Sequence, residues 1–230
     1  MVHDAALPQR TLEVVDLLAE WEVTEEFYLA GGTALALHLG HRQSNDLDFF
    51  TRDPRNRLPA RLDVDAVMAR FRSVEWELST PAEMRCRIDG VEVTFLAYPF
   101  SHRFALWSWR GLSVADPRDI ATQKAYTLGR RAQARDYLDL GALLAQNVVG
   151  MDDLLDWARD TYGEAFSPRL FVQQLTYVDD VPDWDDALAL LVKPTSVDAV
   201  LAELREAVKQ WSTLRFHREA EVPMEGGLQL

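Results

Sequence analysis

The sequence of 230 residues lacks most features that mark secreted, membrane-spanning or zinc-binding proteins. It has one cysteine, Cys86, which excludes an internal disulfide and any site built from several thiolates. No apolar run reaches the roughly 20 residues that cross a bilayer, and the first ten residues lack a signal-peptide pattern. The five histidines are scattered without metal-ligand spacing. We therefore expect an intracellular, cytoplasmic protein.

Basic residues are also fewer than acidic residues. There are 24 Lys and Arg against 37 Asp and Glu, which gives a net charge of −13. A general nucleic-acid binder should carry a basic surface, so this balance argues against one. Basic residues do cluster at 52–72, 85–87 and 124–135. Each cluster is either a solvated face or part of a track for a triphosphate or RNA.

The most informative stretch is 27–51, which reads FYLAGGTALALHLGHRQSNDLDFFT. Its pattern predicts a strand over 27–30, a turn at Gly31-Gly32-Thr33 and a helix over 34–39. Two glycines allow positive φ and let a ligand approach bare N–H groups, and we expect Thr33 to be the N-cap of the helix. A helix start with unpaired N–H groups suits a phosphate.

Two acids follow this helix. A second strand is predicted over 46–51, so that Asp46 and Asp48 point to the same side. Paired carboxylates near a phosphate suit Mg²⁺ or Mn²⁺, since Mg²⁺ completes its shell with water and substrate phosphates. The alternative is an ordinary glycine turn followed by solvated acids. The apolar neighbours Leu47 and Phe49 favour a site, because an idle carboxylate in a buried strand is unfavourable.

These residues resemble a known family. Gly31-Gly32-Thr33 followed by Asp46-Leu47-Asp48 is similar to the first motif of the nucleotidyltransferase superfamily that has the DNA polymerase β type of fold. The string GGTALALHLGHRQSNDLDFF resembles the AbiEii/AbiGii branch, which comprises toxins of bacterial toxin–antitoxin and abortive-infection systems. A second match includes Lys124 and the run Arg135-Asp136-Tyr137-Leu138-Asp139-Leu140. The resemblance covers about residues 5–145.

The resemblance implies a Mg²⁺-dependent nucleotidyltransferase that moves a nucleoside monophosphate from an NTP to a hydroxyl. It implies a toxin with an RNA acceptor, tRNA 3′ ends first, and a cognate antitoxin as partner. Transfer to a protein hydroxyl or to a small molecule such as an aminoglycoside stays open, because the acidic balance suits a cationic acceptor. A non-catalytic NTP-binding module is the alternative of a different class.

The resemblance also implies roles for residues after the first motif. Lys124 is expected to neutralise the triphosphate, and Asp136 to orient or deprotonate the acceptor. Asp139 is expected to support Asp136 or to pair with Arg135, and the alternative is an ordinary surface acid. Arg42 is a further candidate, and its neighbour His41 either contacts the site or lies in a solvated loop.

The third carboxylate of the superfamily is in doubt here. It usually lies on a strand that corresponds to 91–96, where alternation places Glu92 and Thr94 on one face. Thr94 stands where an acid is expected, and Glu92 is the nearest carboxylate. Either Glu92 serves as a metal ligand, or the site holds its metal with two carboxylates.

Patterning along the rest of the chain predicts an α+β fold, a mixed sheet flanked by helices with a C-terminal helical bundle. Strands over 83–88 and 91–97 are joined by Asp89-Gly90, a strong hairpin signal. Helices are predicted over 10–23, from Pro117, which follows the N-cap Asp116, and from Ala134 to about Gln146. In the last of these helices, Asp136 and Asp139 are three residues apart and share one face. The aromatic stretch 99–110 is expected to be core or a lid. We expect residues 1–115 to form the catalytic core, 116–215 a helical region that completes the active site, and 216–230 a flexible tail.

Overall fold

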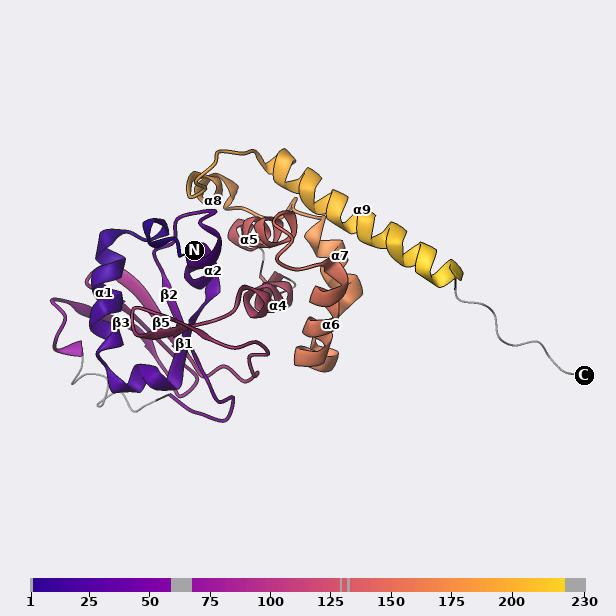
Figure 1. The fold of residues 1–230 in the computed structure, drawn as a ribbon. Coiled ribbons are helices and arrows are strands. Elements are labelled where there is room, and N and C mark those ends of the chain that lie inside the picture. Colours follow the sequence, from indigo (N-terminus) through magenta and orange to yellow (C-terminus); the bar gives the residue numbers. More distant parts are fainter. Residues whose placement is uncertain (1, 59–67, 129, 132, 222–230) are drawn as a thin grey trace, which may run out of the picture.

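The computed structural model describes residues 2–58, 68–128, 130–131 and 133–221, with side chains up to residue 214. Figure 1 shows the sheet and α1 in one half of the molecule and helices α4 to α7 and α9 in the other, with α2 between them, where it packs on α4 and α5. Within the described residues, no helix combines the length and the hydropathy needed to cross a membrane.

Within the described residues, seven strands form one sheet in the order β3-β4-β5-β2-β1-β7-β6. The pairs β2/β5 and β1/β7 are parallel, and the other neighbours are antiparallel. This confirms the predicted mixed sheet. The strand bounds are β1 (Phe27–Ala30), β2 (Leu47–Thr51), β3 (Val74–Ser79), β4 (Glu83–Ile88), β5 (Val91–Leu96), β6 (Trp107–Trp109) and β7 (Leu112–Val114).

Two hairpins show how turn residues set strand pairing. Asp89 and Gly90 both have positive φ, 50° and 88°, as a tight two-residue hairpin requires, and this turn joins β4 to β5 as predicted. Arg110 and Gly111 have φ of 48° and 82° and join β6 to β7 in the same way. The second hairpin was not predicted, because its strands have three residues each and Arg is rare at such a turn.

The helices follow their sequence signals. Pro117 begins α4 at the predicted position, and Gly40 ends α2 with a φ of 59°. The helix expected over 10–23 ends at Ala19, and Glu22–Glu26 forms a 3₁₀ helix. The bounds are α1 (Gln9–Ala19), α2 (Gly31–Leu39), α4 (Pro117–Leu128), α5 (Ala134–Ala145), α6 (Met151–Tyr162), α7 (Pro168–Leu175), α8 (Trp184–Ala189) and α9 (Val197–Glu221).

Helix α9 departs from the expected tail. It continues to Glu221, six residues into the segment expected to be flexible, and the remaining residues 222–230 lie outside the described part of the chain. Its first half packs on α5 and α6.

Packing in the core fixes the direction in which Asp48 points. In β2, Leu47, Phe49 and Thr51 are buried on one face, while Asp48 and Phe50 point to the other. The ring of Phe49 stacks on Phe95 of β5 with centroids 5.2 Å apart. A one-residue shift of β2 would exchange these faces, so the burial of Phe49 fixes the direction of Asp48.

Candidate active site

The glycine turn and Asp48 lie in direct contact. Ala30, the last residue of β1, pairs with Asp48 of β2, and Gly31 follows with a φ of +64°. A Cβ atom built on Gly31 would lie 2.3 Å from Oδ2 of Asp48, closer than any real side chain permits. The absence of a side chain at residue 31 therefore lets the start of α2 lie against the carboxylate.

For the nucleotide transfer that the sequence resemblance implies, we expect Gly31→Ala to lower the rate at least about 100-fold, because the methyl group would displace the Asp48 carboxylate, a predicted metal ligand. Left-handed φ adds strain of about 1–2 kcal/mol for a residue with a Cβ. Gly90→Ala is the matched control: its φ is +88° and nothing lies within 4 Å of the added Cβ. Urea denaturation should show the strain of positive φ in both variants and a further loss in Gly31→Ala from the clash with Asp48, and only Gly31→Ala should lose transfer. Equal transfer by both would contradict the steric argument.

Thr33 is not the N-cap of α2. The helix already begins at Gly31, so Thr33 lies in its first turn. Its hydroxyl instead contacts Ser44 Oγ at 2.8 Å and the main-chain carbonyl of Asp46. Thr33 thus ties the helix to the segment that precedes β2. No side chain caps the N-terminus of α2, which leaves its first N–H groups free for an anion.

Asp46 lies just before β2 rather than within it, and its side chain is 38% exposed. Arg135 on α5 approaches it, with Nη1 3.1 Å from Oδ2. The expected pair between Arg135 and Asp139 is therefore wrong. Arg135 links the helical half of the molecule to the acidic end of β2 instead.

The surroundings of Asp48 disfavour the ionised form of its carboxyl group. Burial raises the pKa of this carboxyl, Lys124 opposes the rise, and Asp46 and Glu92 add to it. Among the described residues no hydrogen bond or ion pair holds its oxygens. A half-buried acid without a direct partner among the described residues, next to two other acids, is a position where a bound cation would relieve repulsion.

Three acids near the turn are candidate metal ligands: Asp46, Asp48 and Glu92. Thr94 is the direct neighbour of Asp48 in the β2/β5 pairing, and Glu92 points to the same face one pair further along. Within the described residues, no three His, Cys, Asp or Glu side chains gather closely enough to hold an ion. Whether Glu92 joins Asp46 and Asp48 as a ligand stays a prediction. Carboxylate oxygens such as those of Asp46 and Asp48 fit Mg²⁺, which takes its other oxygens from water and substrate phosphates.

A buried ion cluster lies behind this acid pair. Asp139 on α5 is fully buried and accepts from Arg42, with Nε 2.7 Å from Oδ1 and Nη2 3.0 Å from Oδ2. Nε2 of His41 lies 2.8 Å from Oδ1, and Nζ of Lys124 lies 2.8 Å from Oδ2. The alternatives of a surface acid at Asp139 and a solvated loop residue at His41 are both wrong.

Charge balance explains how this cluster is stable. Burial alone raises the pKa of Asp139, but Arg42 and Lys124 outweigh it and hold the pKa well below its usual range. Burial alone lowers the pKa of Lys124, but Asp139 and Asp136 outweigh it and the pKa is raised. Asp139, Arg42 and Lys124 therefore stay ionised at neutral pH.

Asp136 forms ion pairs with two basic side chains. It is buried, and its Oδ1 lies 2.6 Å from Nζ of Lys124, while Nε of Arg131 lies 3.1 Å from Oδ2. The predicted location of Asp136 and Asp139 on one face of a helix is correct. Because both oxygens of Asp136 bind cations, its geometry suits the positioning of Lys124 and Arg131 better than deprotonation of an acceptor.

Arg42 joins the ion cluster to the glycine turn. A Cβ atom built on Gly32 would lie 2.1 Å from Nη2 of Arg42, so the second glycine is needed for the guanidinium to fit. The turn thus contacts an acid through Gly31 and a buried cation through Gly32. Arg131 belongs to the basic cluster 124–135, which the sequence offered as a solvated face or a track for a triphosphate, but its ion pair with Asp136 was not predicted.

Comparisons with known proteins agree with this geometry. Residues 16–111 match the family described as the nucleotidyl transferase AbiEii toxin of a type IV toxin–antitoxin system. An uncharacterised protein of Aquifex aeolicus is 27% identical over 179 residues, which cover 76% of this chain and 84% of that protein. The predicted family resemblance is confirmed.

Solved structures share the fold. A crystal structure of a candidate nucleotidyltransferase from H. pylori has a TM-score of 0.56 at 18% identity, covering 90% of this chain and 95% of that one. The nucleotidyltransferase toxin MenT4 from Mycobacterium tuberculosis has a TM-score of 0.51 at 19% identity, covering 92% and 89%. These matches extend beyond residue 111, so the helices α4 to α9 belong to the shared fold.

Proposed function

We propose that this chain transfers a nucleoside monophosphate from an NTP to an acceptor hydroxyl and releases pyrophosphate, because residues 16–111 match the AbiEii family of nucleotidyltransferase toxins. The observation that carries the proposal is the contact between Gly31 and Asp48. This contact supports the proposal because a helix start suits a phosphate, and Asp48 is one of the two carboxylates that we propose as ligands of Mg²⁺.

The glycine turn and the acid pair have different roles in the proposed reaction. The free N–H groups at the start of α2 bind the β- and γ-phosphates. Asp46 and Asp48 would hold Mg²⁺, and the bound ion would supply positive charge to the reacting phosphate. Arg135, next to Asp46, orients that carboxylate and adds positive charge at the mouth of the site.

Lys124 acts mainly as a fixed positive charge. Its amine already binds Asp136 and Asp139, and its charge opposes the rise in the pKa of Asp48. A direct bond from Lys124 to the triphosphate is the role that the resemblance implies, and it requires one of these two acids to release the amine. Arg131 is half exposed and better placed to reach an incoming anion.

Basic side chains beside the acids favour a polyanionic acceptor. On β4, Arg85 pairs with Thr94 and Arg87 pairs with Glu92, so both arginines point to the face that carries Asp48. Their side chains are 40% and 44% exposed, beside Glu83 and Glu77. We therefore propose RNA as acceptor, with the 3′ end of tRNA as first candidate, and control by a cognate antitoxin.

Two observations favour other acceptors or no transfer. The net charge of −13 suits a cationic small molecule such as an aminoglycoside. Thr94 beside Asp48, in place of a third acid, suits a module that binds NTP without transfer. One labelling experiment separates these possibilities.

We expect purified protein with Mg²⁺ to transfer label from one α-labelled NTP to total tRNA. Oxidation of the tRNA 3′ diol by periodate should remove the acceptor hydroxyl and abolish labelling. EDTA should also abolish it, and added Mg²⁺ should restore it, because two carboxylates alone leave the α-phosphate charge unneutralised. Parallel reactions contain a protein extract or an aminoglycoside.

The outcomes decide between the candidates. Label in oxidised tRNA, or equal label with Asp48→Asn, would contradict the proposed transfer. Label in the aminoglycoside alone would establish the cationic acceptor. Binding of NTP by calorimetry with no pyrophosphate released over hours would establish the non-catalytic module.

A further inference from the structure

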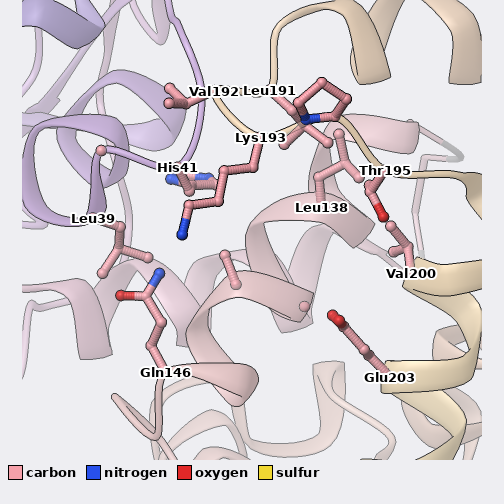
Figure 2. Close-up of a pocket in the computed structure, with 14 residues that line it drawn as sticks. Leu39, His41, Leu138, Gln146, Leu191, Val192, Lys193, Thr195, Val200 and Glu203 are labelled. Carbon is pink, nitrogen blue, oxygen red and sulfur yellow. The ribbon is translucent and has the colours of Figure 1, made fainter.

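A separate pocket lies at the far end of α2. It has a volume of about 380 Å³ and is lined by the C-terminal end of α2, by α5, by the connection from α8 to α9 and by the start of α9 (Figure 2). This volume falls within the range of about 300–1,000 Å³ that is usual for small-molecule sites. Helix α2 runs from Gly31 to Leu39, so the pocket lies roughly 12 Å along the helix from the glycine turn.

The pocket is held open by backbone pairing. The N–H of Gln43 donates to the carbonyl of Leu190 at 2.8 Å, and the N–H of Val192 donates to the carbonyl of His41 at 3.0 Å. These bonds fix the connection between α8 and α9 against the loop after α2. Leu39, Leu138 and Val200 then supply apolar walls. The pocket is therefore preformed and suited to a body with apolar faces.

One ring nitrogen of His41 lacks a hydrogen-bond partner among the described residues. Its Nδ1 is buried without a hydrogen-bond partner, and its side chain is 7% exposed. The other nitrogen, Nε2, lies 2.8 Å from Oδ1 of Asp139. Since the low pKa of Asp139 keeps it ionised, that carboxylate only accepts, and Nε2 must carry the hydrogen. In neutral His41, Nδ1 is then an acceptor that needs a donor from a ligand.

Three further polar side chains of the pocket supply hydrogen-bond donors and an acceptor for a ligand. Figure 2 shows Lys193 and Gln146 on the side of His41, and Glu203 on the opposite side. Lys193 and Gln146 offer N–H donors, while Glu203 accepts. A matching ligand has apolar faces and an edge that carries an N–H donor beside acceptors, which is the chemistry of a nucleobase.

We propose that this pocket is a nucleobase-binding site, separate from the glycine turn, in which a base N–H donates to Nδ1 of His41 once a small movement of the ring uncovers this buried nitrogen. The base belongs either to a free nucleoside or to a nucleotide of an RNA chain. The site goes beyond the proposed transfer and does not depend on it. It contacts the ion cluster through His41 and Asp139, and that cluster contacts the turn through Arg42 and Gly32. Occupancy should therefore alter the turn.

Binding of the four ribonucleosides and of a five-nucleotide single-stranded RNA to the full chain tests the site. Nucleosides carry no phosphate and so avoid the triphosphate position. We expect at least one of these probes to bind wild type with a Kd below about 1 mM. Ala142 is half-buried in the pocket wall, and Ala142→Trp should fill the pocket and weaken binding at least about 30-fold.

The matched control is Ala145→Trp, the same change on an exposed residue of α5 outside the pocket. It should bind like wild type. If Ala142→Trp fails to fold, the exposed pair Lys193→Ala and Gln146→Ala carries the test and should weaken binding about tenfold. Binding of nucleosides assigns the site to free ligand, and binding of RNA alone assigns it to an RNA base. No binding by wild type, or equal binding by the two Trp variants, would overturn the proposal.

Discussion

Asp48→Asn is expected to abolish nucleotide transfer and, in the absence of metal, to raise the melting temperature. The variant keeps the shape of the side chain but removes the charge that would hold Mg²⁺, so transfer should fall at least about 100-fold. The same charge is unfavourable in the metal-free fold, because burial and the neighbouring acids Asp46 and Glu92 raise its pKa. Each 1 kcal/mol of relief corresponds to about 2–4 °C in a chain of this size.

The measurement pairs a transfer assay with thermal unfolding in EDTA. Glu92→Gln is the control, because Glu92 adds to the same negative field but does not join a group of three metal-binding side chains within the described residues. It should also raise the melting temperature slightly while keeping most of the transfer. A lower melting temperature for Asp48→Asn would contradict the electrostatic argument. Unchanged transfer would contradict its role in the reaction.

The raised pKa of Asp48 also sets a pH dependence. A carboxyl whose pKa is raised in the folded state destabilises the fold when ionised, and this penalty is relieved as the pH falls through the raised value. In Asp48→Asn the corresponding step in metal-free stability should be absent.

Much of the fold was predictable because its signals are local. The strand at 27–30, the Asp89-Gly90 hairpin and the helix that begins at Pro117 each depend on residues within one turn or one strand. The β6–β7 hairpin was not predictable, since Trp107–Trp109 and Leu112–Val114 are too short to show alternation. Their pairing depends on β1, which lies about 80 residues earlier in the chain.

The site was predictable in part for the same reason. Gly31 and Asp48 are joined by one antiparallel strand pair, so their proximity follows from adjacent elements. The contacts of Asp139 do not follow from adjacent elements, because Arg42 lies 97 residues away and meets Asp139 only when α5 packs beside α2. Thr33 was misassigned because a helix can begin on glycine without a side-chain cap, and its hydroxyl then serves a tertiary contact.

Asp139→Asn is expected to lower the free energy of unfolding by about 3–5 kcal/mol, since it leaves buried cations without their counter-charge. Arg42 is 2% exposed and Lys124 is 7% exposed, so neither cation can reach water without local opening of the fold. The loss of this anchor should also free the guanidinium that fills the space beside Gly32. Urea denaturation at pH 7 measures the change.

The same substitution at Asp46 provides the control. Asp46 and Arg135 form a pair in which both side chains are 38% exposed, so Asp46→Asn should change stability by about 1 kcal/mol or less. Because the pKa of Asp139 is lowered in the fold, its contribution is present above the unfolded value of about 3.9 and lost as the pH falls below it. Wild type should therefore lose stability in that acidic range more steeply than Asp139→Asn. Equal losses for the two Asn variants, or parallel acid profiles, would show that the buried cluster is not what joins α2 to the helical half of the molecule.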